Sequence, residues 1–218
     1  MQGVIFDMDG VLCDSEPFIC AAAMRMFAER HGARVTPADF IPFVGAGENR
    51  YLGGVAEKYG LKLSLRTDKK RTYAIYLEVI RGRLRPLPGV HNFIARCRRL
   101  GRRLAVATSA DRVKLLGNLR EIGLPADRFD ATVNGLEVRH KKPHPEIFLL
   151  AARRLRVAPA ACIVVEDSPN GIRAGRAAGA RCLGLTTSFP AATLREAGAD
   201  WTAANLAHVP AEVLAGRG

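Results

Sequence analysis

The stretch Val4-Ile5-Phe6-Asp7-Met8-Asp9-Gly10-Val11 decides the fold of this chain of 218 residues. Its apolar beginning, Val4–Phe6, has the length and character of a buried strand in a parallel sheet. Two aspartates and a turn-forming glycine follow directly. Because α/β sheets bind ligands beyond the carboxyl ends of their strands, Asp7 and Asp9 stand where such folds carry out catalysis. A polar turn at a strand end is the plainer alternative.

Four further apolar runs repeat this pattern, and segments of helical length separate most of them. The predicted strands are Leu104–Ala107, Ala131–Val133, Ile163–Val165 and Cys182–Leu185. The helices expected between them are Val113–Ile122, Pro145–Leu155 and Asn170–Ala178, and proline or glycine marks an end of each. Strands that alternate with helices predict an α/β fold with a doubly wound, Rossmann-like parallel sheet.

The interval between the first two strands, about a hundred residues, is far longer than a crossover needs. Its first part has apolar residues at helical spacing, with Ser15 placed to cap the helix and Gly32 to end it. Further helices are expected at Pro37–Phe43, Arg50–Tyr59 and Asp68–Arg81. We therefore predict a catalytic core of residues 1–13 and 85–218, with a helical cap of residues 14–84 inserted over the ligand-binding edge.

Composition excludes several classes of protein. A hydrophobic content of 48% with 25% charged residues is typical of a soluble globular protein, and no apolar run approaches the ~20 residues that span a bilayer. The chain starts without the basic segment of a secretory signal, so we expect a cytoplasmic protein with no membrane association. The five cysteines are odd in number and scattered, which predicts reduced thiols. We expect a monomer or a weak homodimer.

The formal charge of +12 would allow attraction to polyanions, but the basic residues are diffuse. Small arginine clusters fall in predicted helices, and no nucleic-acid motif interleaves them with aromatic residues. We therefore expect no specific nucleic-acid binding. The positive balance instead favours attraction of small anionic substrates.

Two other segments place phosphate-binding groups at the same sheet edge. Thr108 and Ser109 follow the second strand, where a hydroxyl and a backbone N–H can hold phosphate oxygens, although helix capping alone would explain them. Lys142 lies before a helix, in a stretch that two prolines keep extended. A lysine fixed in this way is a point charge for a phosphate, and a solvated basic loop is the alternative.

A second pair of acids, Glu166 and Asp167, ends the predicted strand Ile163–Val165. Carboxylates so close together repel one another unless a cation neutralises them. Together with Asp7 and Asp9 they offer the oxygen ligands that Mg²⁺ prefers. Capping of the next helix by Asp167 or Ser168 is the structural alternative.

In their order along the chain, the four segments resemble the four motifs of the haloacid dehalogenase superfamily. They are FDMDGVL (residues 6–12), VATS (106–109), KPHPEIF (142–148) and VVEDS (164–168). Two longer stretches, DGVLCDSEP and EDSPNGIRAGRAAG, resemble the branch that contains β-phosphoglucomutase and small-molecule sugar phosphatases. The resemblance covers nearly the whole chain, including the place of the helical cap. It implies a phosphatase that acts on a small phosphorylated metabolite, such as a sugar phosphate.

The resemblance also implies a role for each motif residue. Asp7 would attack phosphorus and form an aspartyl phosphate, while Asp9 would protonate the leaving oxygen and later activate water. Thr108, Lys142 and the N–H of Ser109 would hold the transferring group. The implied ligands of Mg²⁺ are the side chain of Asp7, the backbone carbonyl of Asp9, the side chain of Asp167, and Glu166 either directly or through water.

The cap is harder to interpret. Its stretch VGAGENR (residues 44–50) falls where related caps contact substrate, so Glu48 or Arg50 could face the leaving group, but a glycine-rich turn is an equal alternative. Two other functions stay open, an intramolecular phosphomutase and a non-catalytic polyanion-binding protein. Related mutases carry a histidine where this chain has Ile19, and a phosphate-binding arginine where it has Glu48, although Arg50 could substitute. These differences favour water as the final acceptor.

Overall fold

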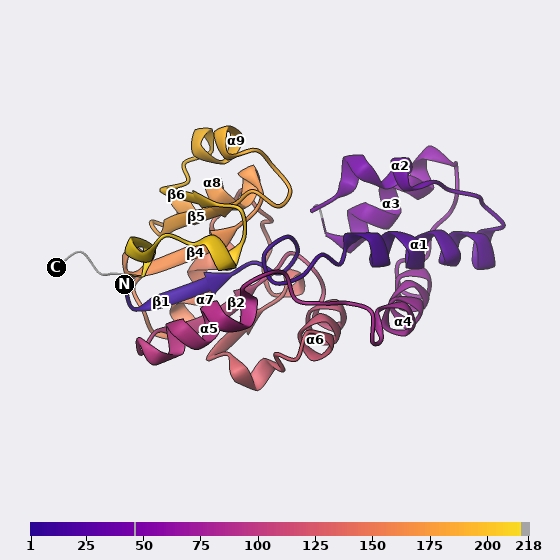
Figure 1. Ribbon diagram of the computed structural model, residues 1–218. Coiled ribbons are helices and arrows are strands. Elements are labelled where there is room, and N and C mark those ends of the chain that lie inside the picture. Colours follow the sequence, from indigo (N-terminus) through magenta and orange to yellow (C-terminus); the bar gives the residue numbers. More distant parts are fainter. Residues whose placement is uncertain (46, 215–218) are drawn as a thin grey trace.

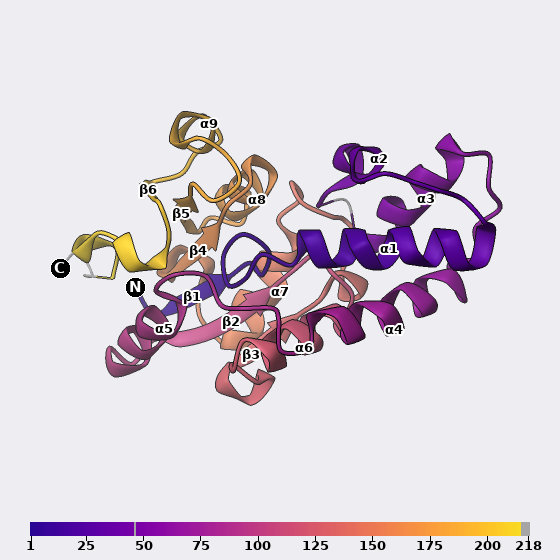
Figure 2. The ribbon, with the colours of Figure 1, turned by 45° about the vertical axis from the view of Figure 1, so that its right-hand side comes forward.

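The computed structural model describes residues 1–45 and 47–214. Six parallel strands form one sheet in the order β3-β2-β1-β4-β5-β6 (Figures 1 and 2). The strands are β1 (Gly3–Phe6), β2 (Arg103–Ala107), β3 (Ala131–Val133), β4 (Cys162–Glu166), β5 (Arg181–Leu185) and β6 (Trp201–Ala203). The chain builds outward from β1 in one direction and from β4 in the other, so the order reverses between these central strands. Ligands bind at such reversal points in open α/β sheets.

The two faces of the sheet are covered by separate helical layers, because successive side chains of a strand point to opposite faces. Val4 and Phe6 join one buried cluster, with α5 (Val90–Arg99) and α6 (Arg112–Glu121). Ile5 joins the other, with the three helices that follow. These are α7 (Glu146–Leu155), α8 (Pro169–Ala177) and α9 (Ala191–Glu196). All four residues of β1 are buried, which fixes the strand that carries Asp7.

The five predicted strands are confirmed, and β6 was not predicted. Trp201 and Thr202 in β6 are only half-buried, because the strand lies at the edge of the sheet. Its sequence therefore lacks the continuous apolar run of a central strand. Helix α9 is similarly short and was also missed.

Helices α1 to α4 form the insert between β1 and β2. They are α1 (Glu16–His31), α2 (Pro37–Phe40), α3 (Glu48–Lys58) and α4 (Asp68–Ile80). Figures 1 and 2 show them gathered on one side of the core, beyond the carboxyl end of β1. The boundaries of the cap at residues 14 and 84 stay a prediction.

Helix α1 confirms the predicted apolar stripe and its stop, but not its cap. Ile19 and Phe27 are among its buried residues, and Gly32 ends it with a left-handed φ of 62°. Ser15 stands at the N-cap position but makes no capping hydrogen bond. Its hydroxyl donates to Asp9 instead, which is a tertiary contact that helix propensity does not encode. The expected helix at residues 37–43 is divided into α2 and a 3₁₀ turn, Ile41–Phe43.

The insert contacts the core at helix α6 and at the residue that precedes it. Lys69 Nζ of α4 lies 2.7 Å from Asp111 Oδ2, next to the start of α6. The Asp111 N–H also donates to Glu48 Oε2 at 3.3 Å, and the Tyr76 hydroxyl of α4 donates to Asn118. These bonds fix how the cap meets the edge of the core.

Several surface expectations can be compared with the structure. Across residues 1–45 and 47–214, no helix is both long and apolar enough to cross a bilayer. All five cysteines are free. Arg98, Arg102 and Arg103 belong to one of the arginine clusters. They donate hydrogen bonds to backbone carbonyls of the core domain, so these arginines have a structural role. The cytoplasmic location and the oligomeric state stay predictions.

Candidate active site

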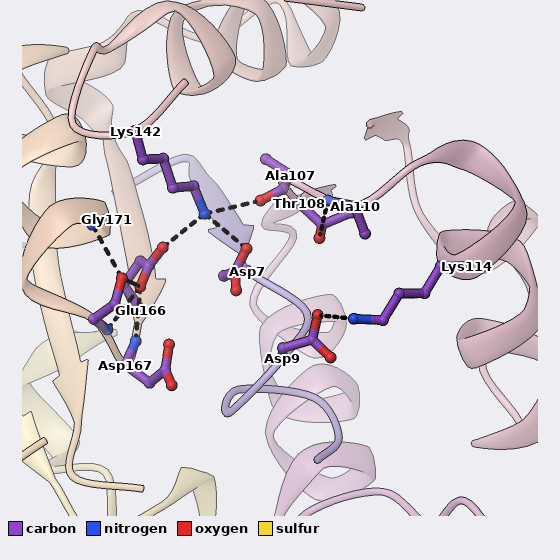
Figure 3. Close-up of polar contacts among 11 residues, drawn as sticks. Asp7, Asp9, Ala107, Thr108, Ala110, Lys114, Lys142, Glu166, Asp167 and Gly171 are labelled. Carbon is purple, nitrogen blue, oxygen red and sulfur yellow. Dashed lines mark hydrogen bonds and ion pairs between the residues drawn. The ribbon is translucent and has the colours of Figure 1, made fainter. Parts of the chain in front are cut away.

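Asp7 lies at the carboxyl end of β1, where its N–H donates to the carbonyl of Val165 at 2.9 Å. Its carboxylate is held by a buried lysine from the loop between β3 and α7. Lys142 Nζ is 2.7 Å from Asp7 Oδ1 and 2.6 Å from Glu166 Oε1 (Figure 3). A side chain only 8% exposed is not part of a solvated basic loop, so that alternative for Lys142 is excluded.

Three buried carboxylates meet around this lysine. Asp7, Glu166 and Asp167 each offer an oxygen within 4.8 Å of the others. Burial raises the pKa of Asp7 to about 7, against the lowering effect of Lys142. Burial also raises the pKa of Asp167 to about 8, and the charges of Glu166 and Asp7 add to that rise. One ammonium does not balance three carboxylates, so the group is suited to hold a hard divalent cation.

Two glycines make room for the acids. From the sequence, Gly10 was expected only to form a turn, and Gly171 was assigned no role. A Cβ at Gly10, where φ is +72°, would lie 1.9 Å from Asp167 Oδ2. A Cβ at Gly171 would lie 1.8 Å from Glu166 Oε1. The approach of these carboxylates therefore requires glycine at both positions. Thr187, also overlooked, donates to the Gly10 carbonyl at 2.6 Å and tethers the turn after Asp9.

Hydrogen bonds from the two residues that follow it orient the Glu166 side chain. Its Oε2 accepts the N–H of Asp167, the N–H of Ser168 and the Ser168 hydroxyl, each at 2.9 Å. Ser168 also caps α8 by accepting the Gly171 N–H at 3.1 Å. Its oxygen therefore fills the capping role that the sequence left open between Asp167 and Ser168. The Ser188 hydroxyl donates to Asp167 Oδ2.

A cavity of ≈ 790 Å³ opens between these residues and the cap. Thr108, at the end of β2, is buried, and its hydroxyl accepts the Ala110 N–H at 3.1 Å. Every predicted site residue except Arg50 lines the cavity. These are Asp7, Asp9, Glu48, Thr108, Ser109, Lys142, Glu166 and Asp167. The structure thus brings the four separated motif segments and one of the two predicted cap residues, Glu48, to a single cavity.

The two candidates in the cap are placed differently. Glu48 is buried at the cavity wall, and burial raises the pKa of its carboxyl. Arg50 is not among the lining residues. Its guanidinium lies 2.7 Å from Glu57 Oε2 and covers the ring of Phe43. Of the pair predicted to face the leaving group, only Glu48 reaches the cavity.

Asp9 is directed to a different lysine, which sequence analysis missed. Lys114 Nζ of α6 lies 3.0 Å from Asp9 Oδ2 (Figure 3). The Ser15 hydroxyl donates to Asp9 Oδ1. Burial would lower the pKa of Lys114, but nearby acids, Asp9 foremost and then Glu48, raise it above its usual range. Lys114 is buried while its neighbour Val113 is 44% exposed. Ordinarily the lysine would be exposed and the valine buried. This exchange of burial in α6 can be seen only in the folded structure.

A second group of metal-binding side chains lies on the surface of the Lys142 loop. His140, His144 and Glu146 each offer a ligand atom within 4.8 Å of the others. The Glu146 oxygens already accept the N–H groups of Arg139 and His140, at 3.0 and 2.9 Å. The carboxylate thereby serves the start of α7, and we assign no metal to this group. The spacing of the histidines in the sequence did not predict their proximity.

Comparison with known proteins agrees with this geometry. Residues 1–179 match the model of the haloacid dehalogenase-like hydrolases. A phosphorylated carbohydrates phosphatase of Thermotoga maritima is 37% identical over 201 residues, which cover 91% of this chain and 92% of that protein. The crystal structure of CbbY from Rhodobacter sphaeroides, in complex with phosphate, superposes with a TM-score of 0.81 at 28% identity, covering 95% of each chain.

A plant relative has a different architecture. The chloroplastic protein SUPPRESSOR OF QUENCHING 1 of Arabidopsis thaliana is 40% identical over 204 residues, but the match spans 91% of this chain and only 19% of that protein. The matched region is therefore a small part of the plant protein.

The chain belongs to the haloacid dehalogenase-like hydrolase family. Within that family it is a phosphatase, a hydrolase of phosphoric monoesters, in the branch that includes β-phosphoglucomutase, CbbY and phosphoglycolate phosphatase.

Proposed function

We propose that this protein hydrolyses a small phosphorylated metabolite, a sugar phosphate or a similar phosphomonoester, with Mg²⁺ and through an aspartyl phosphate on Asp7. The observation that carries the proposal is the contact of Asp7 Oδ1 with Lys142 Nζ at 2.7 Å, on the wall of a cavity shared with the cap. The ammonium orients the nucleophile and offers positive charge to the transferring phosphoryl group.

The reaction takes place in two steps. A carboxylate oxygen of Asp7 forms a bond to phosphorus while the bond from phosphorus to the leaving oxygen breaks, and the Asp9 carboxyl gives that oxygen its proton. In the second step, water attacks phosphorus and gives a proton to the Asp9 carboxylate. The bond from phosphorus to Asp7 then breaks, which releases phosphate and restores both aspartates.

Groups from the second and third motifs hold the phosphoryl oxygens. Thr108 and the N–H of Ser109 lie at the end of β2 on the cavity wall, and Lys142 lies across from them on the loop before α7. Phosphoryl transfer needs little from a protein beyond positioning and charge neutralisation, so this set is sufficient for the chemistry.

A bound Mg²⁺ would neutralise charge on the phosphoryl oxygens, and this chain has suitable groups to hold it. The side chains of Asp7 and Asp167, with the backbone carbonyl of Asp9, are the proposed ligands. Both oxygens of Glu166 already accept hydrogen bonds, from Lys142 and from the Asp167 and Ser168 backbone. We therefore assign Glu166 to the metal through water.

The cap side of the cavity suits a leaving group rich in hydroxyls. Glu16, Glu48 and the Tyr51 hydroxyl line it, and Tyr51 donates to Glu16 Oε1 at 2.6 Å. Carboxylates accept hydrogen bonds from sugar hydroxyls and repel anionic leaving groups. Relatives named for phosphorylated carbohydrates and for hexitols support the same substrate class.

A phosphomutase is the second candidate, because solved relatives include a β-phosphoglucomutase from Clostridium difficile. Ile19, at the position of the mutase histidine, is buried and cannot form a side-chain hydrogen bond to a bisphosphate. Arg50 is paired with Glu57 outside the cavity. Both features support water as the final acceptor.

One assay tests the two functions together. Purified protein with Mg²⁺ is given a panel of sugar phosphates, hexitol phosphates and phosphoglycolate, and released phosphate is measured. We expect fastest release from a sugar or hexitol phosphate. β-Glucose 1-phosphate with a trace of glucose 1,6-bisphosphate is assayed in parallel. Rapid glucose 6-phosphate formation with negligible free phosphate would identify a mutase, and no phosphate release from any ester would refute the phosphatase.

A further inference from the structure

The Asp9 carboxylate is anchored at both oxygens, on the side facing α6 and the cap. Lys114 Nζ lies 3.0 Å from Oδ2, and the Ser15 hydroxyl donates to Oδ1. Figure 3 shows Asp9 directed to Lys114, whereas Asp7 is directed to Lys142. Neither anchoring residue belongs to the groups that hold the phosphoryl oxygens.

The ammonium of Lys114 is committed to this contact. Its side chain is 6% exposed, so it is removed from bulk water, and among the described residues Asp9 is its only hydrogen-bond partner. A buried ammonium without a partner costs several kcal/mol. Lys114 and Asp9 therefore hold each other in place rather than forming a fluctuating surface pair.

The chemistry of the two donors distinguishes the two oxygens of Asp9. An ammonium only donates hydrogen bonds, so Oδ2 is kept as an acceptor. A hydroxyl both donates and accepts, so Oδ1 beside Ser15 can carry a proton without losing its partner. Lys114 thus leaves Oδ1 as the oxygen that exchanges a proton with the leaving group.

We propose that Lys114 is a positioning residue that acts through Asp9 and sets the orientation in which Asp9 protonates the leaving oxygen. This inference rests on the proposed phosphatase reaction and adds a residue outside its four motifs. Lys114 is not needed to stabilise the phosphoryl group itself. Its removal therefore affects esters in proportion to how much their leaving oxygen needs a proton.

Two aryl esters of similar shape separate these effects. 4-Nitrophenolate leaves readily without a proton, whereas phenolate leaves poorly, so the ratio of kcat/KM for 4-nitrophenyl phosphate to that for phenyl phosphate reports help from the acid. The ratio does not depend on the fraction of folded protein. It therefore stays informative even if Lys114→Met lowers stability.

We expect Lys114→Met to raise this ratio by about tenfold or more, since general acids contribute ~10²–10⁴-fold to rate. Asp9→Asn should raise it similarly, and the double variant should raise it no further, because both changes remove the same proton transfer. Lys69→Met is the matched control. It removes a lysine that joins the cap to the core, 2.7 Å from Asp111, without touching Asp9, and should leave the ratio unchanged.

Three results would overturn the inference. In the first, Lys114→Met slows both esters equally, as a purely structural lysine would. In the second, its effect persists in full in the Asp9→Asn background, as expected if Lys114 contacts the leaving group directly. In the third, Lys69→Met shifts the ratio as much as Lys114→Met does. A wild-type protein that hydrolyses neither ester nor any substrate of the panel would refute the phosphatase proposal itself.

Discussion

Two buried lysines hold the two aspartates of the first motif. They come from different elements of the fold and contact different acids. Lys142 comes from a loop in the third motif and contacts Asp7 and Glu166. Lys114 comes from the first turn of helix α6 and contacts Asp9. Lys142 lies among the three buried acids, and Lys114 lies on the side of α6 and the cap. A site built from four motifs can therefore depend on a fifth element that carries no motif.

The largest expected effect comes from the residue that Lys142 holds. Asp7→Asn preserves the shape of the side chain but removes the oxygen nucleophile, so phosphate release should fall by at least ~10³-fold. Circular dichroism and the melting temperature should show that the fold is retained. Near wild-type turnover by the folded variant would assign the nucleophile to another residue.

Lys142→Met sharpens the contrast between the lysines. It removes positive charge from the transferring phosphoryl group, so we expect kcat/KM to fall by ~10²-fold for both aryl esters alike. The 4-nitrophenyl to phenyl ratio should stay close to that of the wild type, unlike the ratio of Lys114→Met. If the ratio rises equally in both variants, the two lysines do not divide the site as we infer.

The same change should weaken folding of the metal-free protein. Lys142→Met leaves Asp7, Glu166 and Asp167 buried with no ammonium, and breaking such a group costs about 3 kcal/mol. Urea unfolding in the presence of a chelator measures this loss. A smaller loss at pH 5 than at pH 8 is expected, because protonation relieves the repulsion among the carboxylates.

A moderate effect is expected from pH on Mg²⁺ binding. In the metal-free protein, burial raises the pKa of Asp7 to about 7 and that of Asp167 to about 8. Protons therefore compete with the metal below those values, and Mg²⁺ should bind more tightly as pH rises from 6 to 9. Titration calorimetry in two buffers of different ionisation enthalpy measures the affinity and the protons released. Equal affinity across that range would place the metal away from these acids.

The folding stability of the metal-free protein should change with pH in the opposite direction. A carboxyl whose pKa is raised by folding binds its proton more tightly in the folded state. Asp7 and Asp167 therefore cost no stability below their unfolded pKa, near 4, and destabilise the fold progressively as pH rises toward 8. Added Mg²⁺ should raise the melting temperature more at pH 8 than at pH 5.

The smallest effects concern the cap. Arg50→Met removes an exposed ion pair with Glu57, so KM should change by less than about twofold. Glu48→Gln alters a buried carboxylate on the cavity wall and should change KM for a sugar phosphate several-fold. Initial-rate kinetics on the best substrate of the panel compares the two variants. The reverse order would mean that Arg50 reaches the substrate after the cap moves.

The α/β sheet, the helical insert and the four motif segments could all be predicted from the amino-acid sequence. Apolar strands such as Val4–Phe6 carry a local signal, because a strand buried on both faces must be continuously apolar. The carboxyl ends of parallel strands also share one edge, so Asp7, Thr108 and Glu166 could be placed together without knowledge of any contact. Edge strand β6 was not predicted, because a half-exposed strand lacks a continuous apolar run.

The partners of individual side chains, in contrast, became visible only in the folded chain. Lys114 looks like a surface residue of an amphipathic helix until α6 is packed against the turn after Asp9. Ser15 looks like a helix cap until its hydroxyl is seen to bond Asp9. Glu48 and Arg50 are two residues apart, yet only Glu48 reaches the cavity. Contacts between segments distant in the chain depend on how the cap docks on the core, and no local periodicity records that geometry.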